Sequence, residues 1–386
     1  MKSFNSPAWF KGQWTQCLSY ACSSALLLGL VACSSTPEKP KPTALVDFNS
    51  KVTAQKVWAV QLGPMNSTLS HNLSSGQLAL VTSAGLVSLL NPTNGAETWR
   101  LALNTPIAAG IGGDGERYAV ISQANELIAM SQGKVIWQVK LPASSFTSPL
   151  VAGGRVFVLT ANRTVLAFDG ASGQRLWMQQ RSGDALVLNQ SGILTSFQDN
   201  LMVGLSGRLV AMNPGNGVAK WEVNMGSSRG TNEIERLTDL VSGVSRVNDV
   251  ICARSFQTSV TCIDALKGSN IWSRAAQGHV GLSGNDGFVF GSESDGKLVA
   301  WHAKNGQVAW QSEALRFRGL TVANWQSGQL LVGDALGWVH WLDASNGQTV
   351  GRLQVDASGI AMTPVRVGQN WVVVTNSGLV QALRAE

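Results

Sequence analysis

The sequence is short of charge: Asp, Glu, Lys and Arg together make up only 13% of its 386 residues. Beyond Cys33 it has no apolar run of about 18 residues, the length that a membrane-spanning helix needs. Helical hydrophobic periodicity is also nearly absent. Glycine, by contrast, occurs 41 times, between short runs of Val, Leu, Ile and Thr. These features predict an all-β protein with many turns, and the mild positive charge argues against nucleic-acid binding.

Residues 1–32 have the organisation of an exported leader. Lys2 and Lys11 supply positive charge, no acidic residue is present, and the apolar run ALLLGLVA ends at Cys33. This run is too short to span a bilayer. The ending LVAC is similar to a bacterial lipobox, which predicts cleavage before Cys33 and acylation of that cysteine. An ordinary secretory signal is the alternative.

The leader divides the chain into three predicted parts. Residues 1–32 form the signal peptide, and 33–44 form a Pro-, Ser- and Lys-rich flexible tether that begins at the acylated cysteine. Residues 45–386 form the folded domain. Ser34, the residue after the cysteine, favours the outer membrane over the inner one by analogy with lipoprotein sorting.

One pattern recurs through the folded domain: a strand, an Asp/Asn turn ending in Gly, and a strand with Trp four residues after that Gly. The copies include GLVSLLNPTNGAETW (85–99), TVLAFDGASGQRLW (164–177) and GKLVAWHAKNGQVAW (296–310). A seventh copy has Gly351 at the Trp position. A period of about 40 residues with about four short strands is typical of a β-propeller. The Trp positions are 58, 99, 137, 177, 221, 272 and 310.

The two ends of this series are each incomplete. The last unit, GLVQAL (378–383), stops before its turn glycine and tryptophan, and KVWAVQL (56–62) is an outer strand without a blade. Each supplies what the other lacks. We therefore predict an eight-bladed β-propeller in which the N-terminal strand completes the last blade and closes the ring.

Few residues have the arrangement of a catalytic or metal site. The histidines show no zinc-ligand spacing, and no Asp-rich calcium loop is present. We expect no catalytic residue, no metal and no cofactor. Cys252 and Cys262 flank a turn near Gln257, which predicts that they lie opposite each other on two strands. A disulfide and a pair of packed free thiols both remain open. The four histidines are His71, His279, His302 and His340.

The repeat resembles a known one. AFDGASGQRLW (167–177) is similar to the PQQ-like repeat of bacterial eight-bladed propellers. Joined to the lipobox, it resembles the BamB (YfgL) family, over essentially the whole mature chain. The resemblance implies a lipoprotein that is anchored in the outer membrane, faces the periplasm and works in the β-barrel assembly machinery. It also implies binding to the POTRA domains of the barrel-forming subunit, and we add a weaker expectation of contact with nascent barrel proteins.

The resemblance also implies which residues bind the partner. The family's Leu-x-Leu-Arg segment matches ALVLNQSG, with Asn189 in place of the Arg. Its acidic loop matches NEIERLTDL (232–240), with Val241 in place of a second Asp. A contact through those two charges is therefore in question. The predicted partner-binding residues are Leu186, Leu188, Asn189, Glu235, Arg236 and Asp239.

The repeat itself indicates the same region. The 51-residue step from Trp221 to Trp272 is the longest, and its surplus lies in 226–243, a charged stretch of a charge-poor protein. This stretch and ALVLNQSG both follow outer strands on consecutive blades, so we expect them to be neighbours on one face. The alternatives are a solvated insertion for the loop and an ordinary core strand for the leucines.

Two other functions remain open. The PQQ-like repeat is shared with PQQ-dependent quinoprotein dehydrogenases, although here no two cysteines are adjacent to line such a cofactor. A cell-envelope protein that binds peptidoglycan or sugar is the second alternative, and would need exposed aromatic side chains at the centre of the ring. Most tryptophans instead occupy the repeat position, where packing needs them.

Overall fold

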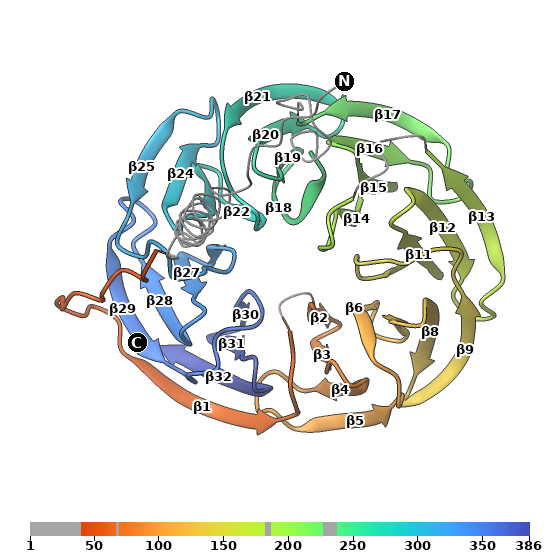
Figure 1. The fold of residues 1–386 in the computed structure, drawn as a ribbon, viewed down its shortest axis with the longest axis horizontal. Coiled ribbons are helices and arrows are strands. Elements are labelled where there is room, and N and C mark those ends of the chain that lie inside the picture. The colour runs from red at the N-terminus through yellow and green to blue at the C-terminus, as the bar shows by residue number, and fades with distance from the viewer. Residues whose placement is uncertain (1–39, 67–68, 182–186, 227–237) are drawn as a thin grey trace, which may run out of the picture. The chain divides into compact units, whose positions relative to one another are not determined.

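A computed structural model describes residues 40–66, 69–181, 187–226 and 238–386. The chain divides into two compact units, Met1–Lys41 and Pro42–Glu386. The second unit is a ring of eight four-stranded antiparallel sheets, and the predicted eight-bladed β-propeller is confirmed (Figure 1). Among the described residues, none lies in a helix long and apolar enough to cross a membrane.

The first four blades follow the chain, each from its inner to its outer strand. Blade 1 consists of β2 (Asn72–Ser74), β3 (Gln77–Val81), β4 (Leu86–Leu90) and β5 (Glu97–Ala102). Blade 2 consists of β6 (Ile107–Gly113), β7 (Tyr118–Ser122), β8 (Glu126–Ser131) and β9 (Lys134–Lys140). Blade 3 consists of β10 (Leu150–Ala152), β11 (Arg155–Leu159), β12 (Thr164–Asp169) and β13 (Arg175–Gln180). Blade 4 consists of β14 (Leu194–Phe197), β15 (Asn200–Leu205), β16 (Arg208–Met212) and β17 (Ala219–Asn224).

The next blades repeat this order, except for the last. Blade 5 consists of β18 (Leu240–Val247), β19 (Val250–Ser255), β20 (Ser259–Asp264) and β21 (Ser269–Ala275). Blade 6 consists of β22 (Leu282–Gly284), β23 (Phe288–Ser292), β24 (Leu298–His302) and β25 (Val308–Ser312). Blade 7 consists of β26 (Asn324–Gln326), β27 (Gln329–Gly333), β28 (Trp338–Leu342) and β29 (Thr349–Gln354). Blade 8 consists of β30 (Val365–Val367), β31 (Asn370–Val374), β32 (Leu379–Ala385) and β1 (Ala54–Gln61).

Blade 8 joins the two ends of the propeller chain. Its outer strand is β1, which pairs antiparallel with β32 from Ala54 opposite Ala385 to Gln61 opposite Leu379. The predicted closure by the N-terminal strand is therefore confirmed. Because this pairing completes the last sheet, the ring has no gap between its first and last blades (Figure 1).

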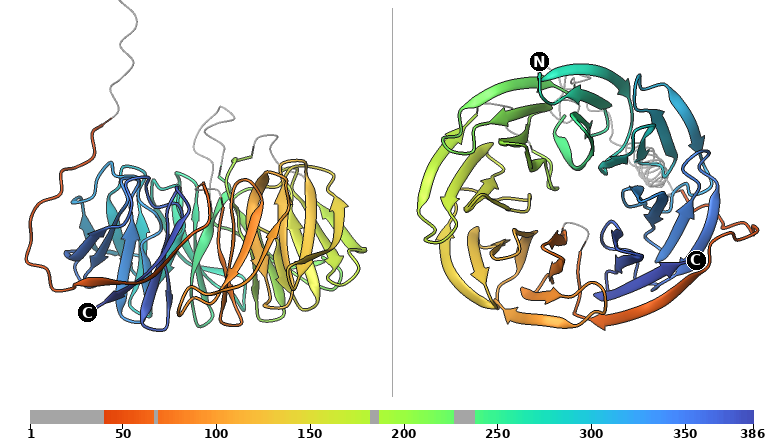
Figure 2. Two further views of the ribbon diagram at one scale, coloured as in Figure 1. Left: turned by 90° about the horizontal axis from the view of Figure 1, so that it is seen from below. Right: turned by 180° about the vertical axis from the view of Figure 1, so that it is seen from behind.

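The order of the strands gives the ring two different faces. The connecting face carries the links from each outer strand to the next inner strand, together with the turns between second and third strands. The turn face carries the turns between first and second strands, and the glycine turns between third and outer strands. In the side view of Figure 2 the connecting face is uppermost, and the C-terminus lies on the turn face.

The repeated tryptophans join neighbouring blades. The Trp272 indole N–H of blade 5 donates to the carbonyl of Ala303 in the glycine turn of blade 6, at 2.7 Å. A Cβ added to Gly306 in that turn would lie 2.5 Å from the Trp272 ring. Gly306 has a φ of +69°, so the position needs glycine both for its backbone and for the close approach of the indole. The same hydrogen bond runs from Trp58 to Pro92, Trp137 to Gly170, Trp177 to Pro214 and Trp310 to Ala344.

Candidate functional site

The two segments singled out in the sequence meet on the connecting face. Leu188 lies in the link between β13 and β14, and Asp239 lies in the link between β17 and β18. The backbone N–H of Leu188 donates to Asp239 Oδ2 at 3.0 Å. The interpretation of Leu188 as part of a core strand is wrong, because it lies outside any strand and is half-buried. The Asp239 carboxylate therefore stabilises the contact between the two links.

Further backbone contacts fix the two links. The N–H of Ser242 donates to the carbonyl of Ser191 at 2.9 Å, and Gly192 forms an isolated antiparallel bridge with Val241. The carbonyl of Asp239 accepts from the N–H of Phe256 at 3.0 Å. The first two contacts connect the link into blade 4 with blade 5, and the third fixes Asp239 within blade 5, so the position of Leu188 is set by backbone geometry as well as by Asp239.

A small open cleft of about 60 Å³ lies beside this contact. Backbone and side chains of blades 3, 4 and 5 line it, and its wall is mostly apolar. Phe146, Leu159 and Leu205 contribute hydrocarbon, whereas Asp239 supplies the carboxylate. A cleft with an apolar wall and a few polar groups at its edge suits the insertion of an apolar side chain from a partner protein.

Of the other residues predicted to bind the partner or carry the lipid, only Asn189 lies in the described part of the chain. Asn189 is exposed at the end of the Leu188 link. Leu186, Glu235, Arg236 and Cys33 lie outside the described residues. Val241, which stands where the family pattern has an Asp, is only 4% exposed, so a carboxylate there would be buried between the links.

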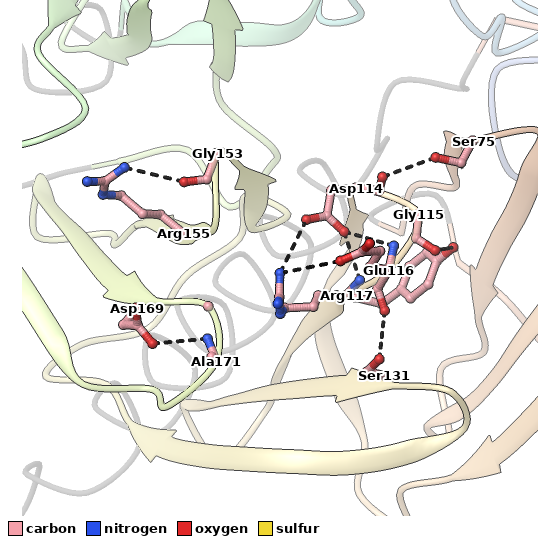
Figure 3. Close-up of polar contacts among 12 residues, drawn as sticks. Ser75, Asp114, Gly115, Glu116, Arg117, Ser131, Gly153, Arg155, Asp169 and Ala171 are labelled. Atoms are coloured by element: carbon pink, nitrogen blue, oxygen red, sulfur yellow. Dashed lines mark hydrogen bonds and ion pairs between the residues drawn. The ribbon is translucent and has the colours of Figure 1, made fainter.

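On the turn face, polar side chains of blades 1 to 3 bond within their own turns or to a neighbouring turn (Figure 3). Asp114 Oδ1 accepts from the N–H groups of Glu116 and Arg117 at 2.9 and 2.8 Å. Asp169 accepts from the backbone and hydroxyl of Ser172, which lowers the pKa of the Asp169 carboxyl. Because these groups shape turns, the turn face offers a weaker case for a partner site.

Two buried polar clusters were missed in the sequence. Asp334, fully buried in the turn between β27 and β28, accepts from Arg318 Nε at 2.6 Å and lies 3.1 Å from His340 Nε2. Burial lowers the pKa of His340. Arg254, also fully buried, pairs with Glu293 at 3.2 Å. Ionic pairs at zero to 8% exposure are out of reach of a substrate, so we interpret both as structural.

Cys252 and Cys262 lie directly opposite each other on β19 and β20. The structure joins them by a disulfide within blade 5. Both residues are at most 3% exposed. Within the described parts of the chain, no three His, Cys, Asp or Glu side chains gather where they could hold a metal ion.

Comparison with known proteins gives a consistent result. Residues 83–312 match a family model described as "Outer membrane protein assembly factor BamB". A protein of that name from Burkholderia pseudomallei is 29% identical, over 94% of this chain and 97% of that protein. Its namesake from Escherichia coli K12 is 26% identical, over 94% and 96%.

Solved structures agree on the fold. BamB from Moraxella catarrhalis superposes with a TM-score of 0.77 and 23% identity, covering 86% of this chain and all of that one. A quinohemoprotein alcohol dehydrogenase from Comamonas testosteroni superposes with a TM-score of 0.64 and 13% identity, covering 86% of this chain and 76% of that one. At these identities both matches show the propeller fold alone.

Proposed function

We propose a scaffold function for this chain, which belongs to the family of the outer membrane protein assembly factor BamB. As a member of that family it takes part in the assembly of outer membrane proteins, in association with the outer membrane. Beyond this family role, the proposal has three parts: Cys33 carries the lipid anchor, the propeller faces the periplasm, and the connecting face binds the POTRA domains of the barrel-forming subunit.

The contact between Leu188 and Asp239 supports the proposed interface. It brings together two links that are 51 residues apart in the sequence, at the edge of a largely apolar cleft. A buried apolar anchor surrounded by polar groups is the arrangement in which a few residues supply most of the binding energy. Asn189, the residue after Leu188, is exposed and therefore accessible to a partner.

Co-purification from detergent-solubilised outer membranes tests the interface. The variant combining Leu186→Ala, Leu188→Ala and Asp239→Lys should lose about tenfold or more of the barrel-forming subunit, since loss of one anchor costs about 2 kcal/mol. Asp199→Lys is the matched control, because it reverses an exposed charge on the turn face. Wild-type recovery with the folded triple variant would refute the interface.

A gain of binding provides a second, independent test. Asn189→Arg restores the basic residue of the family pattern at an exposed position, whose side chain makes no hydrogen bond with the described parts of the chain. We expect it to increase the recovery of the subunit and to make the recovery more sensitive to salt. An unchanged recovery at low salt would place Asn189 outside the interface.

We also propose that the chain is not an enzyme and needs no cofactor. The relatives are named as assembly factors, and the likeness to dehydrogenases is one of fold. After reconstitution with PQQ and calcium and removal of free PQQ, the protein should show neither bound quinone absorbance nor alcohol oxidation. Either signal would favour the quinoprotein alternative.

Nascent barrel proteins are a further proposed partner. The outer strands β9 and β13 each present a free edge with exposed apolar side chains, among them Ile136, Leu176 and Met178. Such an edge can pair with an extended chain by β-augmentation. Photo-crosslinkers at these three positions should capture unfolded barrel precursors, and capture at equal yield from the turn face would argue against edge pairing.

A further inference from the structure

Residues 43–53 cross the outer wall of the propeller from one face to the other. They leave the connecting face near blades 6 and 7, run down the outside of β25 and β29, and reach β1 at the turn face (Figure 2). We call this segment the strap. Although the predicted tether extends to residue 44, Thr43 already bonds to the propeller.

Both ends of the strap are bonded to the ring. At the connecting face, the N–H of Thr43 donates to the carbonyl of Arg316 and its carbonyl accepts from Arg318 Nη1, each at 3.0 Å. Arg318 is itself held by buried Asp334. At the turn face, the N–H groups of Lys51 and Val52 donate to the carbonyl of Val350. Thr53 and Glu386 exchange two backbone bonds of 2.9 Å.

The middle of the strap is held by side chains. Thr43, Leu45 and Phe48 are partly buried, whereas Val46 is 75% exposed. Leu45 packs against the apolar cluster that contains Leu315. The Arg352 guanidinium lies 5.0 Å from the Phe48 ring and 3.7 Å from Asp47. The strap is therefore attached along its length, by side chains that fit the surface of blades 6 and 7.

The strap decides which face the lipid tether leaves from. With the strap bound, the tether runs from Cys33 to Thr43 at the connecting face, a reach of about 35 Å. Without it, the tether would run from Cys33 to Ala54 at the turn face, a reach of about 70 Å. The length of β1, which crosses the wall of the ring, separates the two exits by about 25 Å. Binding of the strap thus halves the maximum extended length of the tether. It also moves the start of the tether from the turn face to the connecting face.

Charge is unevenly distributed over the connecting face: the links into blades 1 to 3 carry none, whereas 226–243 and 313–323 are charged. The connecting-face links at 62–71, 103–106 and 141–149 contain no Asp, Glu, Lys or Arg. The turn face of the same blades carries Asp114, Glu116 and Arg117 in one turn alone. Uncharged loops lose less solvation than charged ones when a face approaches a lipid surface.

We propose that the strap orients the propeller, so that the connecting face, with the Leu188–Asp239 site, is held toward the inner surface of the outer membrane. This inference rests on the proposed lipid anchor at Cys33. The part of this face that meets the phospholipid leaflet is formed by the uncharged links into blades 1 to 3, and the Leu188–Asp239 site beside them stays available to the subunit. The orientation would present the subunit-binding site close to the membrane in which the barrel-forming subunit sits.

Fluorescence quenching in vesicles tests the orientation. The full-length lipoprotein, purified from outer membranes, is labelled at Ala357→Cys on the connecting face or at Lys304→Cys on the turn face, both exposed positions. It is then reconstituted into phospholipid vesicles that carry nitroxide headgroups. Because a face-to-face distance of about 25 Å exceeds the range of contact quenching, the label at 357 should be quenched at least about twofold more strongly.

A strap variant supplies the decisive comparison. Thr43→Pro with Leu45→Ser and Phe48→Ala should reduce the difference between the two labels to none, while Val46→Ser should leave it unchanged. Hydrogen exchange at Lys51 and Val52 reports whether the strap is bound in each protein. Equal quenching of the two labels in the intact protein, or a difference that survives in the strap variant, would overturn the inference. Co-purification with the barrel-forming subunit does not depend on either of these quenching results. It therefore tests the proposed function separately.

Discussion

The contact between each tryptophan and the next glycine turn can be measured with a double-mutant cycle at Trp272 and Gly306. The Trp272 side chain is 6% exposed and donates a hydrogen bond of 2.7 Å to Ala303. Its replacement by alanine should cost about 3–5 kcal/mol. Gly306 has a φ of +69°, and forcing alanine into this conformation costs about 1–2 kcal/mol. The added methyl group also meets the indole ring, which adds about 2 kcal/mol of overpacking.

The overpacking cost depends on the tryptophan. In the Trp272→Ala background, Gly306→Ala should therefore cost only the backbone strain, and the cycle should show a coupling energy of about 2 kcal/mol. Gly328→Ala is the matched control, because Gly328 has a φ of +84° and no atom within 4 Å of an added Cβ. It should cost about 1–2 kcal/mol whether or not Trp272 is present.

Urea unfolding of the four proteins and the control gives these free energies, provided that circular dichroism and fluorescence report one coincident transition. Residues without contact add within about 0.5 kcal/mol. An additive cycle at Trp272 and Gly306 would refute the claim that the glycine is required by the neighbouring indole. Equal coupling for Gly328 would show that the effect is general to the loss of Trp272.

Closure, the disulfide and burial each give a further prediction. Deleting 56–62 should abolish cooperative unfolding because it opens blade 8, whereas deleting 34–41 should leave the melting temperature unchanged; equal melting of both would contradict the closure. Thiol labelling of the unfolded, unreduced mature chain should leave Cys252 and Cys262 unmodified, and two labels per chain would rule the bridge out. Burial lowers the pKa of His71 to about 4. This group should therefore cost up to about 3 kcal/mol of stability as the pH falls from 6.5 to 4. In urea titrations at pH 7 and 4.5, His71→Gln should lose less stability on acidification than the wild type, and an equal loss would place the acid sensitivity elsewhere.

The fold could be predicted because the residues that recur in the repeat are ones that the backbone conformation and the packing require. A turn glycine followed four residues later by Trp recurs at blade spacing, and the positive φ and indole contact at Gly306 show why neither residue is free to vary. The closure by β1 was predictable for a similar reason, since an unmatched outer strand at one end fits an unmatched blade at the other.

The site was predictable only in part. The repeat placed the two links on one face of consecutive blades, but it gave no sign that Asp239 accepts from the backbone of Leu188. The buried pair of Arg318 and Asp334 was missed for the same reason. Its residues are 16 apart, on a link and a turn, and only the folded ring brings them together.

Gly351 shows that a departure from the repeat can be explained by the closure. It occupies the position of the blade-joining Trp in blade 7, whose neighbour is blade 8. In that blade the third strand, β32, and the outer strand, β1, come from opposite ends of the chain, so there is no glycine turn to receive an indole. The strap occupies that place instead: a Cβ on Gly351 would lie 2.7 Å from the carbonyl oxygen of Val52. A tryptophan here would have no turn to bond and would displace the strap, so the missing Trp and the bound strap are two consequences of closing the ring with the N-terminus.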